Sequence, residues 1–152
     1  MPASDYTPTV AEVARHIRAR TRTSLGVLAG TFNTTTNPTD TQVDEHAAEA
    51  ARELERHIGS EIDATLFEHA TDVAAMMAAA QIELSYFPEA VRSGKSVYDQ
   101  LVAMIAEKLP LLKSSVNDVA AGETMGSADD GGHVQYFFES DEGGLVDWQT
   151  QW

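Results

Sequence analysis

The chain of 152 residues contains no cysteine, which excludes disulfides, thiolate catalysis and cysteine-ligated zinc. Long hydrophobic runs are missing as well, since the most apolar stretch, Val73 to Ala80, is only eight residues long. A membrane-spanning helix needs about 20 apolar residues. No basic and then apolar signal peptide opens the chain, because Met1 to Pro8 is polar and contains no Lys or Arg. We therefore expect a soluble protein without membrane contact, and an intracellular origin fits.

Basic and aromatic residues are scarce. The chain has 10 Lys and Arg against 24 Asp and Glu, a formal net charge of −14. This balance argues against a protein that neutralises nucleic-acid phosphates or docks on an anionic membrane. It is compatible with basic partners and with a surface along which DNA slides without sticking. Aromatics make up only 7% of the chain and much of its apolar fraction is Ala, so we expect subunit contacts to complete the stability.

Motifs of common enzyme chemistry are also missing. The sequence has no Gly-x-x-x-x-Gly-Lys phosphate loop, no Gly-x-Gly-x-x-Gly and no nucleophile elbow. Glu12 and His16, like Glu53 and His57, lie four residues apart, whereas a di-iron helical bundle uses Glu-x-x-His. His46 and His57 share a helix face but are separated by about 16 Å of helix rise. We therefore expect no enzyme, no cofactor and no metal site, although spacing does not test a Ser–His–Asp triad.

Helical periodicity dominates the first 121 residues. Thr9 with Glu12, and Thr39 with Gln42, form capping-box patterns at the start of two helices, and Gly59 is a suitable stop for the second. The spacing of apolar residues predicts helices at about 9–17, 39–58, 65–86 and 96–109, with a short continuation at 111–121.

Two prolines and one loop interrupt this pattern. The helix expected over 65–86 is apolar on more than one face, which is typical of a central helix. Pro88 is expected to end or kink that helix, and Pro110 to break or kink the next one. The loop at 21–39 is long enough to be an interface element, and Leu25–Phe32 within it is a candidate for a short β-hairpin.

Four arginines gather near the end of the first helix. Cations at a helix C-terminus are favourable by a few tenths to about 1 kcal/mol, so a structural role and a partner-binding role are equally good interpretations. The candidate inter-subunit contacts of this region are Arg15, Arg18, Arg20, Arg22 and Phe32.

The composition changes sharply after Gly122. Residues 123–152 carry seven acidic residues and no Lys or Arg, yet both tryptophans of the chain lie among the last five residues. Exposed aromatics are typical of interface anchors. We predict an extended arm that adds a β-strand to a partner, with folding back onto its own domain as the alternative. The candidate partner contacts are Tyr136, Phe137, Phe138, Leu145, Trp148 and Trp152.

The expected fold class is thus mainly α. It is a small bundle of about four to five helices, with an early loop or short β-hairpin and an extended C-terminal arm. We predict two parts, a helical domain at 1–121 and the arm at 122–152.

Three stretches of the chain carry a resemblance. The first is Thr7-Pro8-Thr9-Val10-Ala11-Glu12-Val13, followed by Arg20-Thr21-Arg22-Thr23. The second is Gly30-Thr31-Phe32-Asn33, with Thr36-x-Pro38-Thr39 and Gln42-Val43. The third and most specific is Ile82-Glu83-Leu84-Ser85-Tyr86-Phe87-Pro88-Glu89, with Val91 following. With these stretches, which span about residues 7–110, the chain resembles the head-to-tail adaptor (head-tail connector) proteins of long-tailed phages, particularly those of actinobacterial hosts.

The resemblance implies a structural protein of the virion neck, assembled in the host cytoplasm. Such adaptors form a homo-oligomeric ring, usually a dodecamer, beneath the portal protein. The ring extends the channel through which DNA passes without specific binding, and it presents a surface to the next neck or tail-side protein. Adaptors of this kind are small helical bundles whose C-terminal segment commonly reaches a neighbouring subunit or the portal. The arm at 122–152 is not covered by the resemblance, and of its possible partners we favour the portal.

Two functions of other classes stay open. An acidic DNA-mimic or inhibitor would present a dense carboxylate face to a basic enzyme. Against it, 17 acidic residues ahead of the arm are offset by 10 basic ones. A small helical-bundle enzyme or metalloprotein is the other alternative, and metal analysis of the purified protein would test it.

Overall fold

The computed structural model describes residues 3–122 of the chain. This part is mainly helical, as the sequence predicts, and no β-strand occurs in it. The predicted arm, with its candidate contacts Tyr136, Phe137, Phe138, Leu145, Trp148 and Trp152, lies outside the described residues. The helices are η1 (Ala3–Tyr6), α1 (Val10–His16), η2 (Arg18–Arg20), α2 (Asp40–Ile58), η3 (Ala64–Leu66), α3 (Phe67–Tyr86), α4 (Pro88–Arg92) and α5 (Tyr98–Ala120), where η marks a short 3-10 helix.

Both predicted capping boxes are present. The Thr9 hydroxyl accepts a hydrogen bond from the Glu12 amide, and the Glu12 carboxylate accepts one from the Thr9 amide at 2.7 Å. Thr39 and Gln42 make the same reciprocal pair at the start of α2. Each box satisfies amides that have no partner inside the helix, so it sets where the helix begins. At the other end of α2, Gly59 has φ +88°, a conformation that L side chains rarely adopt.

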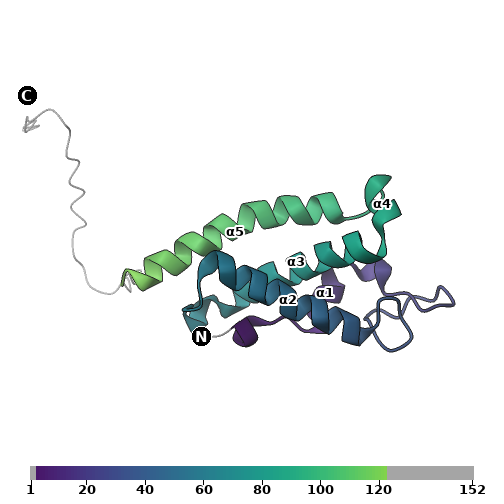
Figure 1. The fold of residues 1–152 in the computed structure, drawn as a ribbon, viewed down its shortest axis with the longest axis horizontal. Coiled ribbons are helices and arrows are strands. Elements are labelled where there is room, and N and C mark those ends of the chain that lie inside the picture. Colours follow the sequence, from purple (N-terminus) through teal and green to yellow (C-terminus); the bar gives the residue numbers. More distant parts are fainter. Residues whose placement is uncertain (1–2, 123–152) are drawn as a thin grey trace, which may run out of the picture.

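The central position predicted for α3 is confirmed. This helix packs against α1, α2 and α5, with α2 and α5 the most extensive neighbours. Figure 1 shows it lying between α5 on one side and α1 and α2 on the other. Its buried residues are Ala70, Val73, Ala74, Ala75, Met76, Met77, Ala78, Ala79, Ala80, Ile82 and Glu83. Because most of these side chains are small, neighbouring helices approach closely and each contact buries little area.

The predicted break at Pro110 is wrong. α5 runs through Pro110 as one gently curved helix (Figure 1). Pro110 and Ala106, whose carbonyl loses its helical partner, both lie on the exposed side, where water can satisfy that carbonyl. On the opposite side Leu101 and Val116, which precede and follow the proline, are both buried in the core. Core contacts of the turns before and after Pro110 therefore keep the helix continuous.

Pro88 does end α3, at Tyr86, as the sequence predicts. It then begins α4, since proline suits the first turn of a helix, where its missing N–H would have no partner. The predicted β-hairpin is wrong, because residues 21–39 contain only two isolated bridges, Arg22 with Leu28 and Thr23 with Thr36. The loop alternative is the one the structure takes.

The bundle has two distinct ends (Figure 1). The loop between η2 and α2, which we call the loop end, projects beside the junction of α3 and α4. The other end holds η3, the beginning of α3 and the final turns of α5. Among residues 3–122 no helix is both long and apolar enough to cross a membrane.

Candidate interaction surface

A buried ion pair anchors the loop end to the bundle. Arg20 of η2 donates from Nε to Glu83 Oε1 at 2.7 Å and from Nη2 to Glu83 Oε2 at 2.9 Å. The Glu83 side chain is 0% exposed and that of Arg20 is 23% exposed. The Arg20 guanidinium carbon also lies 4.4 Å from the centre of the Phe87 ring, in a cation–π contact. A buried carboxylate requires such a partner, and a bidentate guanidinium is the geometry that serves it best.

Threonine and asparagine side chains hold the loop that follows. The buried Thr21 hydroxyl donates to the Arg18 carbonyl at 2.8 Å and accepts from the Gly30 amide at 3.2 Å. Across the loop, the buried Thr36 hydroxyl accepts from the Asn33 amide at 2.9 Å and lies 2.7 Å from the Pro38 carbonyl. These bonds satisfy backbone groups that no strand or helix satisfies. The Thr-rich composition therefore gives a defined shape to a segment that has little core of its own.

The tip of this loop exposes aliphatic side chains. Leu25 is 89% exposed, and Val27 and Leu28 are exposed as well. The backbone beneath them is closed by bonds from the Thr23 amide to the Val27 carbonyl at 2.9 Å and from the Gly26 amide to the Thr23 carbonyl at 2.8 Å. We call Leu25, Val27 and Leu28 the loop tip. Exposed aliphatic side chains gathered at one place mark contact surfaces rather than catalytic ones.

The segment from α1 to the start of α2 is the basic part of an acidic molecule. Residues 13–39 contain four arginines and no Asp or Glu, whereas the other residues of the chain hold all 24 acidic side chains and six basic ones. Arg15, Arg18 and Arg22 are exposed. Arg22 also donates to the Ala19 carbonyl at 3.2 Å and to the Gly26 carbonyl at 3.1 Å, so it supports the loop tip. An acidic partner surface would complement the exposed Arg18 and Arg22.

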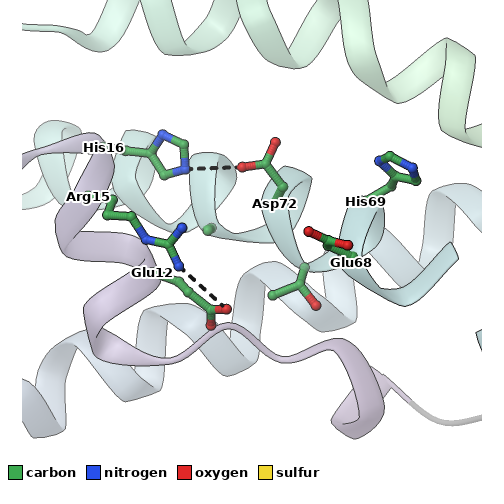
Figure 2. Close-up of a pocket in the computed structure, with 8 residues that line it drawn as sticks. Glu12, Arg15, His16, Glu68, His69 and Asp72 are labelled. Carbon is green, nitrogen blue, oxygen red and sulfur yellow. Dashed lines mark ion pairs between the residues drawn. The ribbon is translucent and has the colours of Figure 1, made fainter.

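A polar pocket of about 500 Å³ lies between α1 and α3 (Figure 2). In it, His16 Nε2 lies 3.5 Å from Asp72 Oδ1, and Asp72 also pairs with Lys108 of α5. His69 points away from this pair in Figure 2. Asp72 therefore links three helices through its two carboxylate oxygens.

Burial lowers the pKa of His16 below its ordinary value of 6.5, although Asp72 acts in the opposite direction. The imidazole is therefore mostly neutral near pH 7, and the contact with Asp72 is then a hydrogen bond rather than an ion pair. Within residues 3–122 no three His, Asp or Glu side chains are placed to hold a metal ion. The polar side chains of this pocket therefore connect α1, α3 and α5 to one another.

An apolar groove of about 380 Å³ lies beside the polar pocket, between α3 and α5. Its apolar lining is Leu66, Val73, Leu111 and Leu112, and we call these four residues the groove. Leu111 is 64% exposed, whereas Val73 and Leu112 are buried at its floor. His69 and Asp72 line both the groove and the polar pocket.

The five candidate inter-subunit residues have different surroundings. Arg15, Arg18 and Arg22 are exposed, and Arg15 makes only a long pair with Glu12, at 3.8 Å. Arg20 and Phe32 instead serve the chain's own fold, since Arg20 is bound to Glu83 and Phe32 is 3% exposed in the core. Phe32 is buried because the loop turns back over the bundle, which a linear sequence does not reveal.

Glu83 and the loop tip were not among the functional residues predicted from the sequence. A carboxylate among the apolar residues of the central helix was a signal that a buried partner is required. Leu25, Val27 and Leu28 within a Thr-, Gly- and Asn-rich loop were a signal of exposed aliphatics. The sequence alone does not identify the partner of Glu83, because Arg20 lies 63 residues away from it in the chain.

A scan against protein-family models, a search of curated proteins and a search of solved structures each found no match to this chain.

Proposed function

We propose that this protein is a head-to-tail adaptor of a long-tailed phage, a structural protein of the virion neck without catalytic activity. Copies of it form a ring beneath the portal protein, extend the DNA channel and present a surface to the next neck or tail-side protein. The observation that supports this most is the loop end, where a buried ion pair fixes a loop that displays aliphatic side chains to a partner.

Parts of the three stretches that carry the resemblance meet at this loop end. Arg20, from the first stretch, binds Glu83 and Phe87, from the third. Thr36, from the second stretch, bridges to Thr23, from the first. Residues distant in sequence thus build one element, and that element is the anchored loop rather than a pocket with catalytic groups. This agrees with a family whose shared residues serve assembly.

The charge of the chain suits the proposed channel. DNA carries one negative charge per about 1.7 Å of its axis, so a basic lining would bind it along its length. Outside residues 13–39 this chain carries four acidic side chains for each basic one, 24 against 6. An acidic lining repels the phosphates and lets DNA move past without specific contacts.

Docking of purified full-length protein onto portal rings of the virus that encodes it tests the proposal. Electron microscopy is expected to show an added ring of density on the tail-side face of the portal. If the portal rings gain no density at saturating protein, the proposal is wrong.

A truncated chain that ends at residue 122 tests the role we propose for the arm. We expect this variant to keep the helical circular dichroism of the full chain and to lose portal docking, because the aromatic contacts from Tyr136 to Trp152 are gone. Normal docking of the folded truncated chain would contradict the role of the arm but not that of the domain.

The DNA-mimic alternative predicts a different result. An inhibitor of that kind binds a basic enzyme through its carboxylates, so its affinity falls steeply with salt. The exposed side chains of Arg15, Arg18 and Arg22 weigh against a uniformly negative binding face.

A further inference from the structure

We propose that the loop tip of one copy docks into the groove of a second copy, so that copies join head to tail. The inference rests on the proposed ring assembly and names the two surfaces that build it. The aliphatic side chains Leu25, Val27 and Leu28 meet the apolar lining Leu66, Val73, Leu111 and Leu112.

The two surfaces lie at opposite parts of one copy. Arg20, at the base of the loop, contacts Phe87, directly after the last residue of α3. Leu66 of the groove comes directly before the first residue of the same helix. A helix of 20 residues is about 30 Å long, so one copy does not bring its own tip to its own groove. A contact between unlike surfaces of identical copies is heterologous, and it produces a closed ring when the rotation between copies closes.

The groove has the size and chemistry to receive aliphatic side chains. Its volume of about 380 Å³ is within the range of sites that bury small-molecule-sized groups, roughly 300–1,000 Å³. The exposed Leu111 at its edge would be covered in the contact. At the tip, the Thr23 amide and the Thr23, Gly26 and Val27 carbonyls are already hydrogen-bonded within the loop. Docking therefore removes apolar surface from water and leaves those backbone groups paired.

Charge complementarity favours a second copy as the occupant. Arg22 supports the loop tip through its hydrogen bond to the Gly26 carbonyl, and residues 13–39 around it contain no acidic residue. Near the groove, Glu68 lines the adjoining polar pocket together with Arg15, which is paired with Glu12, and Asp118 lies on the same face of α5 as Leu111 and Ser115 by helical spacing. Lys108 at the groove is already paired with Asp72.

Sedimentation of three full-length variants tests the contact. The tip variant carries Leu25→Asp and Leu28→Asp, and the groove variant carries Leu111→Asp. The control is Val102→Asp, which replaces another exposed aliphatic residue of α5 that does not line the groove. We expect the tip and groove variants each to weaken self-association by at least about tenfold, and the control to leave it within about twofold. Thermal unfolding of each variant checks that it is folded.

Mixing provides the decisive measurement. An equimolar mixture of tip and groove variants retains one intact tip and one intact groove per pair, so it should form 1:1 dimers and nothing larger. If the mixture stays monomeric, or if the wild-type chain does not self-associate, the inference is wrong. Self-association of the groove variant alone would indicate a tip-to-tip contact and would also overturn it. An effect of Leu111→Asp without any effect of the tip variant would assign the groove to another occupant, such as the arm.

Portal docking separates this inference from the proposed function. A wild-type chain that associates through tip and groove, yet adds nothing to portal rings, contradicts the adaptor function and leaves the contact standing. A tip variant that still completes the ring on the portal contradicts the contact and leaves the function standing. If the tip variant instead loses binding to duplex DNA that the wild type shows as a monomer, the tip is a nucleic-acid contact and the inference fails.

Discussion

The helical bundle and the loop end are stabilised by different kinds of contact. In the bundle, buried Ala side chains such as Ala50 of α2 and Ala74 of α3 allow close helix packing. In the loop end, directional bonds such as those of Thr21 and the Arg20–Glu83 pair define the shape. Packing depends on volume, whereas the loop depends on the geometry of a few polar groups. A loop held in this way keeps its shape without burying its own aliphatic residues, which leaves them for a partner.

The largest effect is expected at the ion pair. Arg20→Ala leaves the Glu83 carboxylate buried without a partner, and we expect it to lower the free energy of unfolding by about 3 kcal/mol. Urea denaturation followed by circular dichroism measures this. Arg18→Ala, an exposed neighbour in η2, is the control and should change stability by less than about 0.5 kcal/mol.

Two further variants show what the pair contributes. Arg20→Lys keeps the charge but loses the bidentate geometry, so it should be intermediate. Combining Arg20→Met with Glu83→Leu removes both charges and should recover most of the loss, because no buried charge is then unpaired. If Arg20→Ala is as stable as the wild type, the loop end does not depend on this anchor.

The next effect concerns volume in the bundle. Ala74→Leu adds three carbons at a fully buried site of α3 and should destabilise the protein by about 2 kcal/mol through overpacking. Ala103→Leu makes the same change at an exposed site of α5 and should be nearly neutral. The two unfolding midpoints, measured side by side, test whether the Ala-lined contacts are close-packed. Equal stability of both variants would mean that the bundle has room at its centre.

A smaller effect is expected where the loop joins the bundle. Thr39→Ala removes the hydroxyl that caps α2 at the end of the loop and should cost about 1 kcal/mol. Thr41→Ala, at an exposed position in the first turn of the same helix, removes a hydroxyl without removing the cap. Thermal unfolding distinguishes the two variants. Because Ala has a higher helix propensity than Thr, Thr41→Ala should be neutral or slightly stabilising. A cost at Thr41 equal to that at Thr39 would show that the loss does not come from the cap.

The smallest effect on stability is expected at Tyr6, a buried polar group that, unlike Glu83, is unpaired among the described residues. The Tyr6 hydroxyl is buried and has no hydrogen-bond partner among the described residues, unlike the Glu83 carboxylate. Tyr6→Phe should therefore be neutral or stabilise the protein by up to about 1 kcal/mol. A clear loss of stability would show that the hydroxyl has a partner.

The pH dependence of the same variant is a second test. Burial, followed by the charges of Glu55 and Asp5, raises the pKa of Tyr6 from 10.0 to about 12. The unfolded chain then releases this proton at lower pH than the folded chain does. The free energy of unfolding is therefore unaffected by this group below pH 10, and it decreases as the pH rises from 10 toward 12. Urea denaturation at pH 9 and 11 should show a smaller decrease for Tyr6→Phe than for the wild type.

Local signals in the sequence predicted the helices well. The capping boxes at Thr9 and Thr39 depend on residues three apart, so they are readable without tertiary structure. The apolar circumference of 65–86 likewise predicted the central helix. The break at Pro110 was wrongly predicted because the effect of a proline depends on which side of the helix faces water. Leu25–Phe32 forms no strand, because its backbone bonds and the Thr21 hydroxyl close turns instead of a regular ladder.

The sequence by itself determined where α1 and α2 begin, which helix is central and that an acidic chain carries a basic segment at residues 13–39. These properties follow from local hydrogen bonding, periodicity and composition. Only the tertiary structure decided that Arg20 and Phe32 turn inward while Leu25 and Leu111 stay exposed at separate parts of the molecule. Burial depends on contacts between residues far apart in the chain, and the spacing of residues along it carries no record of those contacts.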